Sequence, residues 1–127
     1  MKALVVDDSR SMRAILSKQL KDLGFQVVEA DGGAAALRAL NEQGPFELML
    51  LDWNMPEMDG CEVLSLIRSE PKYKNMRVMM VTTESEMSQV AVALEAGANE
   101  YLMKPFDRNS LVEKLVLLGM DPAGRAG

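Results

Sequence analysis

The sequence contains no histidine, and this absence removes several kinds of chemistry at once. A chain without imidazole cannot use histidine as a general base or as a metal ligand, and it cannot itself donate a phosphoryl group from phosphohistidine. It has a single cysteine, Cys61, so no disulfide can form within the chain. We predict that Cys61 is a small, partly buried residue near the start of a helix, in a protein that works in the reducing cytoplasm.

Positive charge is also scarce, with 14 lysines and arginines against 19 acids and a net charge of −5. Proteins that bind nucleic acid normally carry a basic patch, so we expect no nucleic-acid partner. No apolar run approaches the roughly 18 residues that a membrane helix needs, and no signal-peptide pattern opens the chain, so we expect no membrane insertion. The 127 residues, 48% of them hydrophobic and 26% charged, suit one globular domain, which we place at residues 1–120. The small, polar segment 121–127 is expected to be a flexible tail.

Strand-like and helix-like segments alternate five times along the chain. Strands are predicted at 2–6, 26–30, 47–51, 77–81 and 100–103. Helices are predicted at 10–23, 34–41, 61–69, 83–97 and 108–118. This alternation indicates an α/β fold, a doubly wound parallel sheet with helices on both faces. We predict the flavodoxin-like strand order 2-1-3-4-5, because the third strand is apolar throughout and the second is short and flanked by polar residues.

The third predicted strand stops abruptly at Asp52, and Pro56 then blocks a regular continuation. Open α/β sheets place their chemistry at the carboxyl ends of their central strands. A buried strand does not need an acid for its own stability, so we predict a chemical role for Asp52.

Polar residues end the other strands too: Asp7 and Asp8 the first, Thr82 the fourth and Lys104 the fifth. In the predicted strand order these side chains converge with Asp52 at one edge of the sheet. Carboxylates so close repel one another unless a hard divalent cation lies among them, and oxygen ligands with room for water favour Mg²⁺. A carboxylate in that setting can attack phosphorus, with Lys104 countering charge on the transferring oxygens and Thr82 donating a hydrogen bond to the phosphate.

Each of these signals also has an ordinary structural explanation. An acidic pair or a threonine after a strand often caps the next helix, and a lysine before proline is usually solvated. A phosphohydrolase that uses Asp52 as its nucleophile is a second functional hypothesis. Such enzymes generally need a second acid two residues later, where this chain has Asn54, and a cap over the substrate, for which it has no insertion. The combination at the strand ends favours a phosphoacceptor.

Four segments carry these residues: Val-Val-Asp-Asp-Ser at 5–9, Asp-Trp-Asn-Met-Pro-Glu-Met-Asp-Gly at 52–60, Val-Thr at 81–82 and Tyr-Leu-Met-Lys-Pro-Phe at 101–106. Together they resemble the receiver domain of two-component response regulators, most of all the stand-alone receivers of chemotaxis. The resemblance extends from residue 1 to about residue 120. It implies a phosphoacceptor switch, not an enzyme, with an intrinsic ability to take up and release its own phosphate.

The resemblance assigns roles to individual residues. It implies that a histidine kinase phosphorylates Asp52, and that Asp7, Asp8 and Asp52 hold Mg²⁺ together with the backbone carbonyl of Asn54. It implies that Lys104 contacts the phosphoryl group.

Further roles concern the coupling to output. The resemblance implies a cis Lys104–Pro105 peptide bond and makes Thr82 and Tyr101 a coupled switch, with a half-buried aromatic on an edge strand as the less favoured explanation of Tyr101. Glu84 and Asn54 stand where the family varies residues that tune dephosphorylation.

Two outputs fit such a receiver. The chain, which we expect to be a monomer, could bind a downstream protein such as the flagellar switch through its fourth helix, fifth strand and fifth helix. The apolar residues proposed for that face, which could equally belong to the core, are Met87, Val90, Leu94, Tyr101 and Met103. Alternatively, it could be an intermediate that passes its phosphate to a histidine phosphotransfer protein. The fourth helix lacks the lysine of the flagellar-switch surface, so the output partner stays open.

Overall fold

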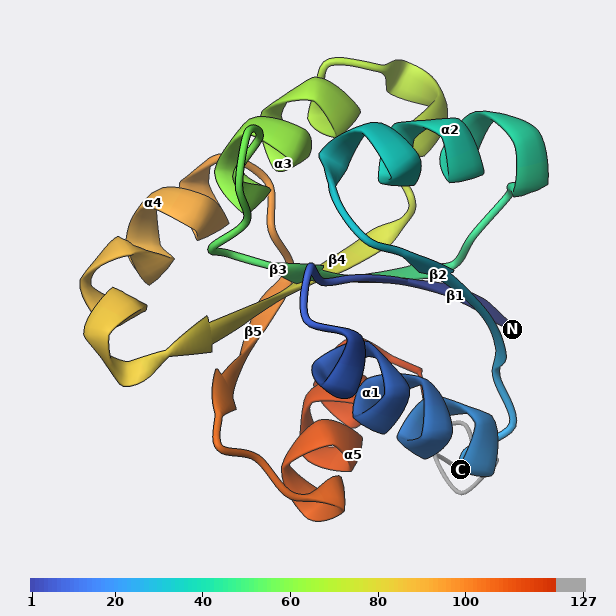
Figure 1. Ribbon diagram of the computed structural model, residues 1–127, viewed down its shortest axis with the longest axis vertical. Helices are drawn as coiled ribbons and strands as arrows, with labels where there is room; N and C mark the ends of the chain where they lie inside the picture. Colours follow the sequence, from blue (N-terminus) through green and yellow to red (C-terminus); the bar gives the residue numbers. More distant parts are fainter. Residues whose placement is uncertain (121–127) are drawn as a thin grey trace.

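The computed structural model describes residues 1–120, apart from the side chain of Glu84, and the predicted tail at 121–127 lies outside the described residues. Five parallel strands form one sheet (Figure 1). They are β1 (Lys2–Val6), β2 (Gln26–Ala30), β3 (Leu48–Asp52), β4 (Arg77–Thr83) and β5 (Glu100–Lys104). Their order in the sheet is β2-β1-β3-β4-β5, which confirms the predicted flavodoxin-like topology.

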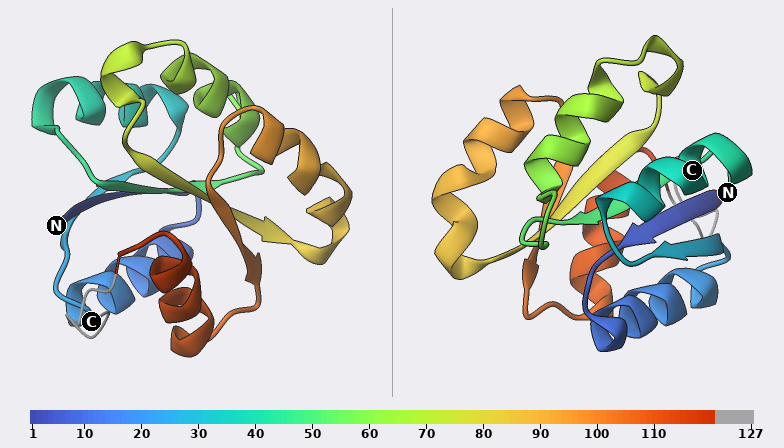
Figure 2. Two further views of the ribbon diagram at one scale, coloured as in Figure 1. Left: turned by 180° about the vertical axis from the view of Figure 1, so that it is seen from behind. Right: turned by 45° about the horizontal axis from the view of Figure 1, so that its top comes forward.

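Helices cover both faces of the sheet (Figures 1 and 2). The α-helices are α1 (Arg10–Asp22), α2 (Gly33–Gln43), α3 (Gly60–Arg68), α4 (Val90–Glu95) and α5 (Arg108–Leu117). Two short 3₁₀ segments, η1 (Pro71–Tyr73) and η2 (Glu84–Gln89), flank β4. Helices α1 and α5 lie on one face, and α2, α3 and α4 lie on the other. None of the helices within residues 1–120 has the length and apolar character of a membrane span.

The sheet divides the core into two apolar clusters because successive side chains of a strand point to opposite faces. In β3, Leu48 and Leu50 pack with the residues of α1 and α5, whereas Met49 and Leu51 pack with those of α2 and α3. These four side chains are fully buried. The central strand is therefore buried on both faces, as its continuous apolar run predicts.

Helix ends follow the capping signals in the sequence. The side chain of Ser9 accepts a hydrogen bond from the backbone N–H of Met12 at the start of α1, and Asp107 does the same for Ser110 at the start of α5. Asp59 and Glu62 form a capping box at the start of α3. These caps fix where the loops at the carboxyl edge of the sheet turn into helices.

The predicted boundaries differ from the structure mainly at this same edge. Asp52 and Lys104 are themselves the last residues of β3 and β5, and β4 continues to Thr83. The predicted helix at 83–97 is wrong in its first half, because η2 is a 3₁₀ segment and only residues 90–95 are α-helical. The Thr83 to Glu86 spacing is nevertheless used, since the Glu86 carboxylate accepts a hydrogen bond from the Thr83 backbone N–H.

Candidate functional site

The predicted site residues reach one edge of the sheet because parallel strands end on the same side. Asp52 ends β3, and Asp7 follows β1, whose Val6 is paired with Leu51. Carboxylate oxygens of Asp7, Asp8 and Asp52, which we call the acidic cluster, all lie within 4.8 Å of one another. Asp7 and Asp52 are buried, whereas Asp8 is exposed. The cluster is thus open to solvent on the side of Asp8.

In the described part of the chain, Lys104 is the one basic residue that forms ion pairs with this cluster. Its Nζ lies 3.2 Å from Oδ1 of Asp52, to which it donates a hydrogen bond, and 3.7 Å from Oδ2 of Asp7. One ammonium group is therefore paired with two of the three carboxylates. The cluster keeps an excess of negative charge when all three acids are ionised.

Burial and neighbouring charge perturb Asp52 strongly. The pKa of Asp52 is raised from 3.8 to about 6, mainly by burial and next by the negative charge of Asp7, with a smaller contribution from the charge of Asp8. The charge and hydrogen bond of Lys104 act in the opposite direction and lower it. Perturbed carboxyl groups in such settings are typical of functional sites. A positive charge added to the cluster would favour the ionised form of Asp52.

The two carboxylate oxygens of Asp7 differ in their hydrogen bonding. Its Oδ1 accepts a hydrogen bond from the Ser9 backbone N–H at 2.8 Å, and its backbone carbonyl accepts one from Arg13 at 2.8 Å. Its Oδ2 is buried and has no hydrogen-bond partner within residues 1–120. A buried carboxylate oxygen without a donor is costly, and a cation would remove that cost. The metal-ligand atoms that the acidic cluster offers are all carboxylate oxygens, so they fit a hard ion such as Mg²⁺ and not zinc.

Asn54 lies two residues beyond Asp52, in the exposed part of the loop that leads to α3. The predicted role of its backbone carbonyl as a metal ligand stays a prediction. The Lys104–Pro105 peptide bond is cis, the isomer that the resemblance implies, and the Gly44–Pro45 bond is cis as well, which the sequence analysis did not anticipate.

Thr82 lies near the end of β4, and its side chain is fully buried. Its hydroxyl oxygen is 3.2 Å from the Thr83 carbonyl oxygen and 3.2 Å from Oε1 of Glu86. Among the hydrogen bonds formed within residues 1–120, none joins this hydroxyl to Asp52 or Lys104. Thr82 therefore stands beside the acidic cluster with its hydroxyl engaged elsewhere.

Tyr101 is half-buried on β5 and packs against the core cluster under α2, α3 and α4. The ammonium group of Lys114 in α5 lies 4.1 Å from the centre of its ring and 3.0 Å from a carboxylate oxygen of Glu100. Tyr101 thus packs on the side of the sheet that α4 covers and also contacts Lys114 of α5. The sequence analysis missed the contact of Lys114 with Tyr101 and that of Glu86 with Thr82. The sequence carries a signal for only one of them, the capping-box spacing between Thr83 and Glu86.

The apolar face predicted on the fourth helix and fifth strand is partly correct. Leu94 on α4 and Met103 on β5 are exposed, and Val92, two residues before Leu94, is exposed as well. We call Leu94, Tyr101 and Met103 the α4–β5 face; Val92 is left out because residues two apart on a helix point in different directions. Val90, which the sequence analysis assigned to the same face, is buried because it points into the core, and Met87 is half-buried.

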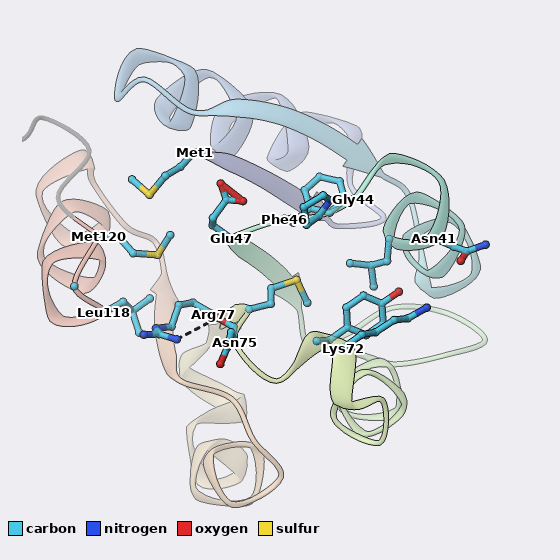
Figure 3. Close-up of a pocket in the computed structure, with 15 residues that line it drawn as sticks. Met1, Asn41, Gly44, Phe46, Glu47, Lys72, Asn75, Arg77, Leu118 and Met120 are labelled. Carbon is cyan, nitrogen blue, oxygen red and sulfur yellow. Dashed lines mark hydrogen bonds between the residues drawn. The ribbon is translucent and has the colours of Figure 1, made fainter.

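A cavity of about 750 Å³ opens at the end of the sheet opposite the acidic cluster, where the strands begin (Figure 3). It lies where β1, β3 and β4 begin, with Met1, Glu47 and Arg77 along its wall and Met120 beyond the end of α5. Its position at the amino ends of the strands separates it from the acidic cluster. It is therefore not the site that the sequence predicts.

Comparisons with known proteins agree with this geometry. The family model described as the response regulator receiver domain matches residues 3–116. The chain is 43% identical over 121 residues to the chemotaxis protein CheY1 of Helicobacter pylori, covering 94% of this chain and 98% of that protein. It is 43% identical over 116 residues to the chemotaxis protein CheY of Pseudomonas aeruginosa, covering 91% of this chain and 93% of that one.

A solved structure gives the same result. The chemotaxis response regulator CheY4 of Vibrio cholerae superposes with a TM-score of 0.83 at 35% identity, covering 92% of this chain and 97% of that one. The family match spans most of the chain, and the acidic cluster lies where the sequence analysis expects a receiver to have its site. The chain belongs to the receiver-domain family of two-component response regulators.

Proposed function

We propose that this protein is a response regulator of a two-component phosphorelay, in which phosphorylation of Asp52 switches a protein-binding face, and that it acts in chemotaxis signalling. The observation that carries the proposal is the position of Asp52, a buried acid at the carboxyl end of the central strand, 3.2 Å from Lys104 Nζ and among two further acids. The receiver unit would extend over residues 1–120, and its compartment would be the cytoplasm, which suits its single cysteine.

Mg²⁺ is the cofactor that the acidic cluster fits best. Asp7, Asp8 and Asp52 would hold it, together with the backbone carbonyl of Asn54. When bound, the ion supplies positive charge that offsets the repulsion between the acids and the charge on phosphoryl oxygens. The buried Oδ2 of Asp7, which accepts no hydrogen bond within residues 1–120 and has Lys104 Nζ only at 3.7 Å, is the observation that favours such an ion.

The chemistry assigned to the protein itself is nucleophilic. A carboxylate oxygen of Asp52 would attack the phosphorus atom of a phosphohistidine on a partner kinase, so that an O–P bond forms while the P–N bond of the donor breaks. The histidine must come from the partner, since this chain has none. Lys104 is within reach of the oxygens on Asp52 and would counter their charge, and the Thr82 hydroxyl would donate to the phosphoryl group after turning toward it. We propose no catalytic turnover beyond this self-phosphorylation and the later hydrolysis of the phosphate.

The output would be a binding event. The α4–β5 face carries exposed apolar side chains. Tyr101, which belongs to this face, is half-buried and lies on β5, the strand paired with β4, and β4 carries the buried Thr82. The relatives named as chemotaxis proteins favour a partner such as the flagellar switch and give no support to the phosphotransfer alternative. We propose that the protein works as a monomer.

The test is phosphoryl incorporation from a small phosphodonor such as acetyl phosphate, with and without Mg²⁺, followed by mass spectrometry of the intact chain. We expect one phosphoryl group per wild-type chain, none on Asp52→Asn and none in EDTA. Asp31→Asn is the matched control, because Asp31 follows β2 as an exposed acid outside the acidic cluster, and it should be phosphorylated normally. Incorporation by Asp52→Asn, or many turnovers of an added phosphomonoester, would contradict the proposal.

A further inference from the structure

The carboxylate of Glu86 collects three hydrogen bonds on a single oxygen. Its Oε1 lies 2.9 Å from the backbone nitrogen of Thr83, 3.1 Å from the hydroxyl of Thr83 and 3.2 Å from the hydroxyl of Thr82. Glu86 itself is half-buried in η2, directly after β4. The side chain therefore ties the first turn of η2 to the last residues of β4. Hydrogen bonds to an ionised carboxylate are stronger than those between neutral groups.

The bond with Thr82 matters because a hydroxyl has only one proton to donate. Thr82 is fully buried, and both of its acceptors, Oε1 of Glu86 and the carbonyl of Thr83, belong to the turn that leads into η2. Val81, the residue before Thr82, pairs with Asp52 in the sheet, so Thr82 is next to the phosphoacceptor strand. Donation to a phosphoryl group on Asp52 would require this proton to leave Glu86.

We propose that Glu86 is a positioning residue that holds the Thr82 hydroxyl turned away from Asp52 in the unphosphorylated protein and so opposes the active state. The proposal rests on the function proposed above, in which Thr82 donates to the phosphoryl group. The bond from Thr82 to Glu86 is made in only one of the two states, so its free energy shifts the equilibrium between them.

The position of Glu86 also links the site to the output. The 3₁₀ segment η2 runs directly into α4, which carries Leu94 of the α4–β5 face. Once Thr82 no longer donates to Glu86, η2 loses a tie to β4 while the bonds from Thr83 remain. Release of Thr82 is thereby coupled to the start of the helix that carries the binding face.

The experiment measures the affinity for beryllofluoride, a stable stand-in for the phosphoryl group, in the presence of Mg²⁺. The fluorescence of Trp53, which adjoins Asp52, reports binding. We expect Glu86→Ala to bind beryllofluoride about tenfold more tightly than the wild type, because the charged one of the two competing acceptors is gone and only the Thr83 carbonyl remains. Glu86→Gln keeps an uncharged acceptor, so its gain should be smaller. Glu95→Ala, which removes an exposed acid of α4, is the control and should bind as the wild type does.

A double-mutant cycle separates this role from a merely structural one. Thr82→Val keeps the shape of the side chain but removes the proton for which Glu86 and the phosphoryl group compete. In the Thr82→Val background, Glu86→Ala should no longer raise the affinity. If Glu86 acted only through the fold of η2, its replacement would have the same effect in both backgrounds.

The outcomes distinguish this inference from the proposed function. If the wild type binds beryllofluoride but Glu86→Ala does not bind it more tightly, or if the gain persists with Thr82→Val, the role of Glu86 is wrong and the proposed function stands. If the wild type does not bind beryllofluoride with Mg²⁺, the proposed function fails and the inference fails with it. Should Glu86→Ala not unfold cooperatively, the same cycle is carried out with Glu86→Gln, and the absence of a gain in that variant would overturn the inference.

Discussion

Lys104 Nζ lies 3.2 Å from Oδ1 of Asp52, although β4 separates their strands in the sheet. Lys104 is the last residue of β5 and Asp52 the last residue of β3, so the two side chains meet across the carboxyl end of β4. The same ammonium group lies 3.7 Å from Asp7 of the loop after β1. One cation thus joins residues from three parts of the sheet. Its charge lowers the pKa of Asp52, but burial, together with the charges of Asp7 and Asp8, outweighs it, so this pKa is raised to about 6.

This raised pKa predicts how stability depends on pH when no divalent ion is present. A pKa that is higher in the folded state than in the unfolded chain means that folding favours the protonated acid. The free energy of unfolding should therefore fall as the pH rises from about 3.8 to about 6, and the shift between these values is equivalent to at most about 3 kcal/mol, which screening by solvent reduces. Asp52→Asn removes the ionisation and should stabilise the protein by about 2 kcal/mol at pH 7. Urea unfolding in EDTA at several pH values measures both effects.

The control for this prediction is Asp31→Asn, which changes an exposed acid at the same edge and should leave the stability within about 0.5 kcal/mol of the wild type. The explanation would be wrong if Asp52→Asn were less stable than the wild type at pH 7. It would also be wrong if both proteins lost stability equally between pH 4 and pH 6.

Removal of Lys104 should have the opposite effect on stability. Lys104→Met leaves Asp7 and Asp52 buried without their countercharge, and we expect a loss of about 2 kcal/mol at pH 7 in EDTA. Lys18→Met breaks an ion pair of similar length with Asp22, but that pair is on the surface of α1, so its loss should stay below about 0.5 kcal/mol. Equal losses in the two variants, measured by urea unfolding, would show that burial does not decide the contribution of Lys104.

The fold was predictable because its main determinants are local or periodic. The apolar run before Asp52 identified a strand buried on both faces, and the polar flanks of the second strand placed it at an edge, which together with right-handed crossovers leaves few strand orders. The fourth helix was predicted too long because its capping-box spacing also suits a 3₁₀ turn. The cis Gly44–Pro45 bond leaves no pattern in the sequence that distinguishes it from a trans bond.

The site was predictable to the extent that strand ends define it. Asp7, Asp8, Asp52 and Lys104 came together because parallel strands end at one edge, and no longer-range information was needed. The side-chain partners could not be predicted in the same way. The bond from Thr82 to Glu86 depends on how η2 turns, and the contact of Lys114 with Tyr101 depends on how α5 packs against the sheet. Both are consequences of tertiary packing.

Arg68 should be the polar residue outside the site to which stability is most sensitive. Its guanidinium group donates to the carbonyl oxygens of Tyr73, Met76 and Gly97 and to the side chain of Asn99, at 2.7 to 2.9 Å. Arg68→Ala removes a donor from each of these acceptors, although Asn99 Oδ1 and the Tyr73 carbonyl also accept from backbone N–H groups, and we expect a loss of about 3 kcal/mol by urea unfolding. Arg68→Lys should recover little of it, because an ammonium group cannot reach several acceptors as a planar guanidinium does.

The control for Arg68 is Arg38→Ala, which removes an exposed arginine from α2 and should change the free energy of unfolding by less than about 0.5 kcal/mol. A small loss in Arg68→Ala would mean that water satisfies the four acceptors equally well.

Gly60, the first residue of α3, tests how closely the helix must approach the phosphoacceptor strand. A Cβ atom at this position would collide with the backbone carbonyl oxygen of Asp52 and would lie 3.1 Å from the Cα of Trp53. Because these are backbone atoms, they cannot move aside without displacing the end of β3. Gly60→Ala should therefore lower the free energy of unfolding by about 2 kcal/mol and weaken Mg²⁺ binding several-fold, as followed by Trp53 fluorescence. Gly32→Ala is the matched control, since a Cβ atom there meets no described atom within 4 Å and the backbone is extended, so stability and Mg²⁺ affinity should both stay near the wild-type values. If Gly60→Ala lost stability but bound Mg²⁺ normally, the end of β3 would be able to shift without disturbing the acidic cluster, and the close packing of α3 would be a matter of stability alone.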